Sequence, residues 1–305
     1  MSFSLIAVLG PTASGKSDLA IEIAKYLTAS GSPAEIINAD AMQLYRHMNI
    51  GTAKLSLEEQ QGIPHHLFDV IDPSEEMTAV QYQEIARSKT RDLLERGITP
   101  IFVGGSMFYV SAALDNLEFA PTDPAVRAAL ELEAEQVGHI TMHDRLKVLD
   151  PITAERIPSQ NIRRVIRALE VIAITGSEYS SQLPEQAFWL PTLELGIAVE
   201  RDVIKNRIAK RVEKMWESGL VEEAETLLAN WGLSRTAKMA IGYQQAFKQL
   251  FGEYSDTEAI AETVSLTQRY ARRQMSWFRR DKRINWLDGS AELVEQATER
   301  IRLEQ

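Results

Sequence analysis

Residues 10–17 read Gly10-Pro11-Thr12-Ala13-Ser14-Gly15-Lys16-Ser17, and this stretch decides the fold. It matches the phosphate-binding pattern G-x-x-x-x-G-K-S/T in the required context, because the apolar run Leu5–Leu9 precedes it and helical periodicity follows over residues 18–27. Glycines in such a loop let backbone amides point at phosphate oxygens, and the helix N-terminus adds a favourable dipole. Lys16 supplies a positive charge, and the Ser17 hydroxyl is placed to bind Mg²⁺. The motif predicts a phosphorylated ligand but does not say whether phosphate is transferred.

Short apolar segments alternate with helical segments along the rest of the first hundred residues. We predict further strands at residues 34–38, 100–103 and, later, 195–199, with an amphipathic helix at 79–96. Strands that alternate with helices indicate an α/β fold, here a P-loop NTPase-like core with a parallel sheet. Ligands of such sheets bind at the carboxyl ends of the strands, so we expect the site at that edge.

Residues 118–185 differ from the rest of the chain. They show helical patterns broken by prolines and no convincing strand, so we predict a helical insertion domain there. Residues 1–117 and 186–305 then form the catalytic core. Its C-terminal part is expected to be almost entirely helical, with helices at residues 201–218, 220–230, 238–251 and 256–279.

The composition excludes several classes of chemistry. The 305 residues include no cysteine, which removes disulfides, thiolate nucleophiles and cysteine zinc sites and is compatible with a reducing cytosol. No apolar run approaches the length of a membrane span, and the N-terminus lacks the features of a signal peptide. We therefore expect a cytoplasmic protein without a membrane partner, and we expect it to be a monomer. His65 and His66 are placed in a polar loop, where structural hydrogen bonding is favoured over a metal site.

The acidic residue near the loop stands at an unusual place for a kinase. Kinases and NTPases of this fold usually carry an acid after a later strand, which helps to hold Mg²⁺. Here the strand at 100–103 is followed by Gly104-Gly105-Ser106, whereas Asp40 follows the strand at 34–38. Taken alone, Asp40 could also be a helix N-cap. A phosphate loop can equally hold a diphosphate that leaves, so the residues alone leave a kinase and a transferase open.

A series of motifs in sequence order resembles the tRNA dimethylallyltransferase (tRNA isopentenyltransferase) family over about residues 5 to 288. These motifs are Gly10–Ser17, Asp40–Tyr45, Gly51–Lys54, Pro64–Leu67, Gly104–Ser106, Arg167–Val171, Ala240–Tyr243 and Arg272–Arg279. The resemblance implies transfer of a dimethylallyl group from dimethylallyl diphosphate to the exocyclic N6 amine of the adenosine 3′-adjacent to the anticodon in tRNA. Diphosphate leaves in this reaction, and Mg²⁺ is the implied cofactor.

The resemblance also implies the roles of the catalytic residues. Asp40 would accept the proton of the adenine amine, which is a poor nucleophile because its lone pair is delocalised into the ring. Ser106 stands where the family has a threonine that hydrogen-bonds the bridging oxygen of the donor, and Arg211 matches a diphosphate-binding arginine. Residues 10–17 would bind the diphosphate or a nucleotide, with Ser17 as the metal ligand. Arg207 shares a helix face with Arg211, and without the resemblance this pair could be a solvated face.

The anticodon stem-loop of tRNA is the second implied partner, and residues 118–185 are expected to contact it. The positions that match tRNA-binding motifs are Asp40, Ala41, Met42, Gln43, Ser106, Arg127, Arg163, Arg164, Arg167, Gly242, Arg272, Arg273, Gln274, Trp277 and Arg279. The family commonly has glutamine where this chain has Arg163, and it often has arginines where this chain has Met239 and Gln244. Gln43 could read the edge of an extruded adenine. For Trp277 and Phe278, packing in the core is favoured over stacking on bases.

Three other functions stay open from the sequence. The chain could be a small-molecule or nucleotide kinase, a prenyltransferase that acts on free adenine nucleotides, or a tRNA-binding module without catalysis. The basic segments 163–167 and 269–283 favour an RNA partner in a chain whose net charge is −10. A tRNA prenyltransferase also requires the phosphate loop and residues 269–279 to lie on the same side of the molecule.

Overall fold

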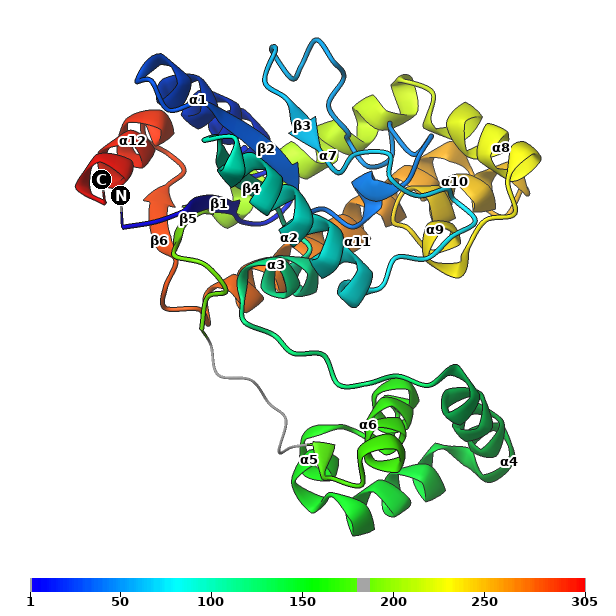
Figure 1. Cartoon of the computed structure of the whole chain (residues 1–305). Helices are drawn as coiled ribbons and strands as arrows, with labels where there is room; N and C mark the ends of the chain where they lie inside the picture. Colours follow the sequence, from blue (N-terminus) through cyan, green and yellow to red (C-terminus); the bar gives the residue numbers. More distant parts are fainter. Residues whose placement is uncertain (1, 180–186, 305) are drawn as a thin grey trace. The chain divides into compact units, whose positions relative to one another are not determined.

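The computed structural model describes residues 2–179 and 187–304, and its core is a parallel sheet (Figure 1). Within these residues the sheet has six strands in the order β3-β2-β4-β1-β5-β6, and every neighbouring pair is parallel. The strands are β1 (Leu5–Leu9), β2 (Ala34–Asn38), β3 (His65–His66), β4 (Thr99–Gly104), β5 (Thr192–Ala198) and β6 (Asn285–Asp288). The predicted α/β fold with a parallel sheet is confirmed.

Helices cover both faces of the sheet because successive side chains of a strand point to opposite sides. On β1, Ile6 and Val8 pack in one core cluster with residues of α1 (Lys16–Ala29) and α12 (Leu293–Leu303). Leu5 and Leu9 pack in the other cluster, on the opposite face. Helices that contribute to that second cluster are α2 (Ala79–Glu95), α3 (Met107–Leu114), α8 (Leu220–Asn230), α9 (Arg235–Lys238), α10 (Tyr243–Leu250) and α11 (Asp256–Phe278).

Two further elements lie beside the carboxyl ends of the strands. A 3₁₀ turn, η1 (Met42–Leu44), follows β2, and α7 (Arg201–Glu217) follows β5. Buried residues of α7 pack with Ala13 of the phosphate loop and Ala271 of α11, so these three segments form one small cluster. This arrangement brings the loop and two C-terminal helices together.

The chain divides into two compact units, which are residues 1–115 with 188–305 and residues 116–187. The insertion predicted from the sequence covers residues 118–185, two residues fewer at each end than the second unit. The second unit contains α4 (Pro124–Leu149), which is kinked at Gly138, α5 (Pro151–Arg156) and α6 (Ile162–Thr175). Its core includes Leu146 and Val165.

A buried carboxylate organises the second unit. Glu170 of α6 is fully buried and accepts hydrogen bonds from Arg127 and Arg167 at 2.8 Å each, and from the Thr122 hydroxyl at 2.7 Å. Burial alone would raise the pKa of Glu170, but the hydrogen bonds from these three side chains hold it at about 2. Within the described ranges, no helix combines the length and apolar character needed to cross a bilayer.

Candidate active site

The phosphate loop joins β1 to α1 with a strained backbone. Gly10, Ala13 and Gly15 have positive φ values of 148°, 63° and 93°, the region that favours glycine. Lys16 Nζ donates a hydrogen bond to the Pro11 carbonyl at 2.7 Å, so the lysine is held by its own loop. The loop is therefore shaped as an anion cradle, and an anionic ligand would compete with the Pro11 carbonyl for the ammonium group.

Two arginines of α7 reach the same loop. Arg211 Nη1 donates to the Thr12 hydroxyl at 3.3 Å, and Arg207 Nη1 donates to the Ala13 carbonyl at 3.4 Å. Both arginine side chains are also exposed to solvent, so this face of α7 contacts the loop and water. With Lys16, they surround the loop with positive charge suited to a diphosphate.

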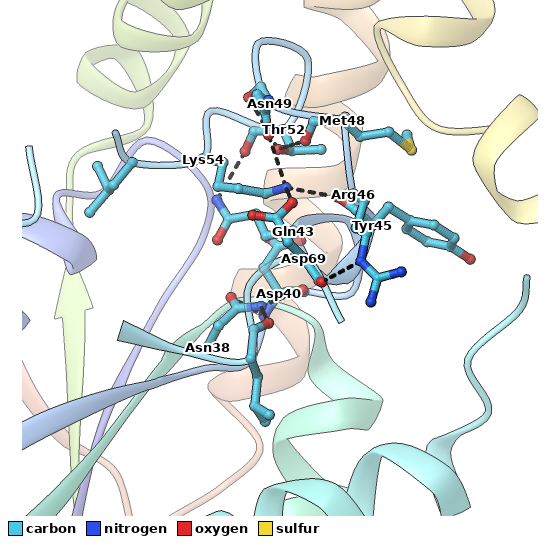
Figure 2. A network of polar contacts seen from close by, with 12 residues as sticks. Asn38, Asp40, Gln43, Tyr45, Arg46, Met48, Asn49, Thr52, Lys54 and Asp69 are labelled. Atoms are coloured by element: carbon cyan, nitrogen blue, oxygen red, sulfur yellow. Dashed lines mark hydrogen bonds and ion pairs between the residues drawn. The ribbon is translucent and has the colours of Figure 1, made fainter. Parts of the chain in front are cut away.

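Asp40 lies beside this loop, just after β2. Its Oδ1 accepts a hydrogen bond from the Met42 amide at 2.9 Å, and its own amide donates to Asn38 Oδ1 at 2.9 Å (Figure 2). The carboxylate thus caps the 3₁₀ turn, and it is also close enough to Lys16 for their charges to interact. Burial raises the pKa of Asp40, and the Met42 amide and Lys16 oppose this rise. Burial lowers the pKa of Lys16 to about 8, against the attraction of Asp40.

Ser106 links the ends of β4 and β2. It is buried before the first turn of α3, and its Oγ accepts a hydrogen bond from the Ala41 amide at 2.8 Å. The close approach requires glycine at position 104, because a Cβ there would lie 2.3 Å from the Ala39 carbonyl oxygen. Ser106 is thereby fixed next to the residue that follows Asp40.

Gln274 of α11 joins the phosphate loop to the end of β4. Its Oε1 accepts from the Thr12 amide at 2.9 Å, and its Nε2 donates to the Gly105 carbonyl at 2.7 Å. The loop and residues 269–279 therefore lie side by side, as the sequence reading requires. Only 1% of Gln274 is exposed, so its side chain lies inside the protein, and the predicted tRNA contact of this residue stays a prediction. The sequence held no signal for the bridging role.

The metal-binding capacity of the site is small. Ser17 lines a cavity of about 20 Å³ together with Asn38 and Gln43. In the described part of the chain, no group of three or more histidine or acidic side chains could hold a metal ion. This donor set fits Mg²⁺ where ligand phosphates and waters supply most of the coordination, which is the usual state of Mg²⁺ in phosphate sites.

A larger cavity opens beside the loop, at the carboxyl ends of β5 and β6. Its volume is about 1010 Å³, and it extends from Pro11 to α7 and α11. Basic side chains line it: Arg201, Lys205, Arg207, Arg272 and Arg279. The cavity therefore suits an anionic ligand.

Known proteins match this chain over most of its length. The family model of the IPP transferases matches residues 43–281. The chain is 49% identical over 296 residues to a tRNA dimethylallyltransferase of Thermobifida fusca, covering 96% of this chain and 93% of the relative. It is 50% identical to a tRNA dimethylallyltransferase of Streptomyces avermitilis, covering 94% of this chain and 91% of the relative.

The chain belongs to the tRNA dimethylallyltransferase family.

Solved structures agree with this membership. A tRNA isopentenylpyrophosphate transferase of Bacillus halodurans superposes with a TM-score of 0.71 at 37% identity, covering 98% of this chain and 95% of that one. A eukaryotic dimethylallyltransferase acting on tRNA gives a TM-score of 0.85 at 25% identity, covering 98% of this chain and 78% of that one.

The arginines predicted to contact tRNA fall into two groups in this family member. Arg163 and Arg164 on α6 are exposed, as are Arg272, Arg273 and Arg279 on α11. Arg127 and Arg167 instead pair with Glu170, so part of each guanidinium group stabilises the insertion. A direct tRNA contact of this second group stays a prediction.

Gly242 and Trp277 are two further residues that were predicted to bind tRNA. Gly242 is buried at the start of α10 with φ of 95°, so it shapes the backbone and cannot contact RNA. Phe278 is buried as expected, with 2% exposed, but Trp277 is 36% exposed under the guanidinium of Arg280. The expectation that Trp277 packs in the core is wrong, and its ring is accessible.

A scaffold behind Asp40 was missed from the sequence. Lys54 is largely buried, and its Nζ donates to the Tyr45 carbonyl, to Asn49 Oδ1 and to Asp69 Oδ1 (Figure 2). Gln43 Nε2 donates to the carbonyls of Thr52 and Ala53. These bonds fold residues 43–54 into one unit.

The same unit is anchored from α8. Glu223 accepts hydrogen bonds from the amides of Asn49 and Ile50 and from the Tyr243 hydroxyl. A Cβ on Gly51 would lie 2.4 Å from the Tyr243 ring, so glycine is required there. The motif residues 51–54 and Tyr243 therefore support the site and do not line it.

Proposed function

We propose that the chain transfers a dimethylallyl group from dimethylallyl diphosphate to the N6 amine of the adenosine 3′-adjacent to the anticodon in tRNA, with release of diphosphate. One observation carries this proposal: a diphosphate cradle after β1 and a carboxylate of raised pKa, Asp40 after β2, lie close together at the carboxyl edge of the sheet, on either side of β4. The cradle suits a leaving group, and the carboxylate suits a base.

Each group then has a defined task. The bond between the allylic carbon and diphosphate breaks as the bond from N6 to that carbon forms, and the N6 proton passes to Asp40. The loop amides, Lys16 and Arg211 stabilise the negative charge that grows on the diphosphate. The Ser106 oxygen accepts a hydrogen bond from Ala41, and its hydrogen, which faces Tyr270 in this structure, would turn to the bridging oxygen of the donor.

We assign Mg²⁺ to the same diphosphate, with Ser17 as the protein ligand. The ion would neutralise charge on the departing diphosphate. The limited donor set around Ser17 supports an ion that arrives with the phosphate ligand and keeps several waters.

The acceptor is proposed to be the tRNA anticodon stem-loop. Exposed arginines on α6 and α11 would contact its phosphates, and the basic cavity beside the loop would accommodate part of its backbone. Gln43 is placed to accept from the adenine amine, because only its amide nitrogen is engaged in the hydrogen bonds formed with Thr52 and Ala53. Binding should weaken steeply with salt. The monomeric state and the cytoplasmic location stay predictions.

The proposal is tested by incubating the protein with dimethylallyl diphosphate, Mg²⁺ and unmodified tRNA, followed by mass analysis of the nucleosides. We expect one dimethylallyl adenosine per tRNA. Asp40→Asn should lower kcat by about 100-fold or more while tRNA binding changes less than about twofold. Asp92→Asn, a surface change on α2, is the matched control and should leave turnover unchanged.

Other outcomes would identify a different enzyme. Phosphate transfer from ATP without use of dimethylallyl diphosphate would establish a kinase. Prenylation of AMP but not of an anticodon stem-loop would establish an enzyme of free nucleotides. Binding of tRNA without prenylation, unchanged in Asp40→Asn, would establish a binding module.

A further inference from the structure

A single amide group connects two strand ends at the centre of the site. β1 and β4 are neighbours in the sheet, and their last paired residues are Leu9 and Gly104. Beyond that pair the two backbones separate, one into the phosphate loop and the other toward Ser106. The side chain of Gln274 lies there and replaces a rung of backbone hydrogen bonding, accepting from Thr12 and donating to Gly105.

We propose that Gln274 is a positioning residue for prenyl transfer, whose amide sets the spacing between the diphosphate cradle and the strand end that carries Ser106. The inference rests on the proposed function and deepens it. It assigns the residue a role inside the site in place of a contact with tRNA.

The local structure is shaped to admit this amide. A Cβ on Gly105 would lie 2.3 Å from Gln274 Nε2, so only glycine leaves room for the side chain. Within the side chain, one atom must accept and another must donate, which an amide of this length achieves and an apolar or charged side chain does not. Because Gln274 is 1% exposed, losing either partner would leave a buried polar group unsatisfied.

The bridge reaches both sides of the reaction. On the cradle side, Thr12 is held twice, through its amide by Gln274 and through its hydroxyl by Arg211. On the other side, Gly105 precedes Ser106, whose Oγ accepts from the amide of Ala41 next to Asp40. The diphosphate cradle and the proposed base are therefore linked by a short path of hydrogen bonds and two peptide bonds.

A second residue of α11 supports the same link. Tyr270 lies one helical turn before Gln274, and its hydroxyl contacts the side chains of Ser106 and Gln274. α11 thus holds the strand end from two successive turns. Displacements of about 1 Å between reacting groups cost on the order of 100-fold in rate, so a small loosening here should be measurable.

The test compares three variants of the full chain. Gln274→Met keeps the length and removes both hydrogen bonds. Gln274→Glu keeps the oxygen that accepts from Thr12. When the new carboxyl group is ionised, its second oxygen faces the Gly105 carbonyl oxygen and the two repel each other. When the carboxyl group is protonated, it donates a hydrogen bond to Gly105 as the amide does. Gln249→Met makes the same chemical change on a partly buried amide of α10, which also accepts one hydrogen bond and donates another but lies outside the site, and serves as the control.

We expect Gln274→Met to lower kcat about 10- to 100-fold per titrated active site, with Kd for tRNA and for inorganic pyrophosphate within about threefold of the wild type. The ratio of kcat for Gln274→Glu to wild-type kcat should rise as the pH falls from about 8 to about 6, because protonation restores the donor. Gln249→Met should match the wild type in kcat per active site.

Three results would overturn the proposal. They are a raised Kd for tRNA with kcat unchanged at saturating tRNA, a kcat for Gln274→Met within threefold of the wild type per active site, and a Gln274→Glu ratio that stays flat with pH. A wild-type protein that does not prenylate tRNA would instead refute the proposed function itself, because all three comparisons are made relative to wild-type turnover.

Discussion

Lys16 and Asp40 carry opposite charges in a setting that disfavours both. Burial lowers the pKa of Lys16 to about 8 and raises the pKa of Asp40, while their mutual attraction opposes each shift. The two groups are therefore poised to change charge closer to neutrality than ordinary lysine and aspartate side chains. Such pKa values suit a site that combines a general base with a cation that binds an anion.

The pH dependence of kcat/KM follows from these shifts. Activity needs Asp40 ionised and Lys16 protonated in the free enzyme. It should rise with pH through the pKa of Asp40, which lies above the usual value of about 3.9, and fall above about pH 8 as Lys16 loses its proton. Steady-state rates at subsaturating dimethylallyl diphosphate would give the profile.

Lys16→Arg provides the control for the alkaline limb. Arginine keeps its charge throughout this range, so the fall near pH 8 should disappear even though the rate is lower. A limb that persists in this variant would show that another group titrates there.

The residues found from sequence and those missed differ in a physical way. The loop, Asp40 and Ser106 could be predicted as one site because each follows a strand, and parallel strands end at the same edge. Gln274 could not be predicted, because its partners lie 262 and 169 residues away and nothing local marks it as buried. The same holds for Glu223, which anchors residues 49–51 from another helix.

At the scale of elements, β5 contains an ionisable side chain, Glu194, inside the sheet. Glu194 pairs with Ala7 in the middle of the sheet and is 3% exposed, and its Oε2 has no hydrogen-bond partner among the described residues. Burial raises the pKa of Glu194 to about 8, with help from Asp281 and Asp115 and against the attraction of Arg283. The strand is therefore most stable with this side chain neutral.

Stability should consequently fall as the pH rises. The folded-state pKa of about 8 exceeds the unfolded value of about 4.3, so between these values the folded state binds more protons and is destabilised by deprotonation. Glu194→Gln should remove this slope and make the protein more stable than wild type by a few kcal/mol above pH 8. Urea unfolding at several pH values measures it.

An exposed glutamate supplies the comparison. Glu217→Gln on α7 changes the same chemical group in solvent and should leave the slope unchanged. Equal slopes for wild type and Glu194→Gln would contradict the assignment of this pH dependence to the buried residue.

Among the strands, the sequence patterns missed the two at the edges of the sheet. β3 has two residues, His65 and His66, which were expected in a loop, and β6 reads Asn285-Trp286-Leu287-Asp288 without an apolar run. Both lie at edges of the sheet, where less of a strand is buried and the pattern is correspondingly weak. The helix expected at 238–251 begins only at Tyr243, because α9 ends at Lys238 and Gly242, with a positive φ, is the N-cap of α10.

At the scale of the whole molecule, the two units have separate cores, and this separation can be measured. Glu170→Ala would leave Arg127 and Arg167 without their shared carboxylate and should destabilise the second unit by about 3 kcal/mol. Calorimetry should then show residues 116–187 melting first. Pyrophosphate binding by the first unit should persist after tRNA prenylation is lost.

Glu133→Ala is the matched control in the same unit. It breaks an ion pair with Arg145 in which both side chains are more than 40% exposed, and such pairs contribute little. An equal loss of stability in the two variants would show that burial of Glu170 is not what matters.

The strand order has a consequence for synthesis of the chain. β1 lies between β4 and β5, but β5 begins only at Thr192, after the whole insertion. On the ribosome, β3, β2, β4 and β1 can pair early, while the far edge of β1 stays open with its apolar side chains until residues 192–198 emerge. The helical insertion, whose contacts are local, can fold during that interval. The protein is therefore most exposed to misassembly with other chains while only these four strands have been synthesised.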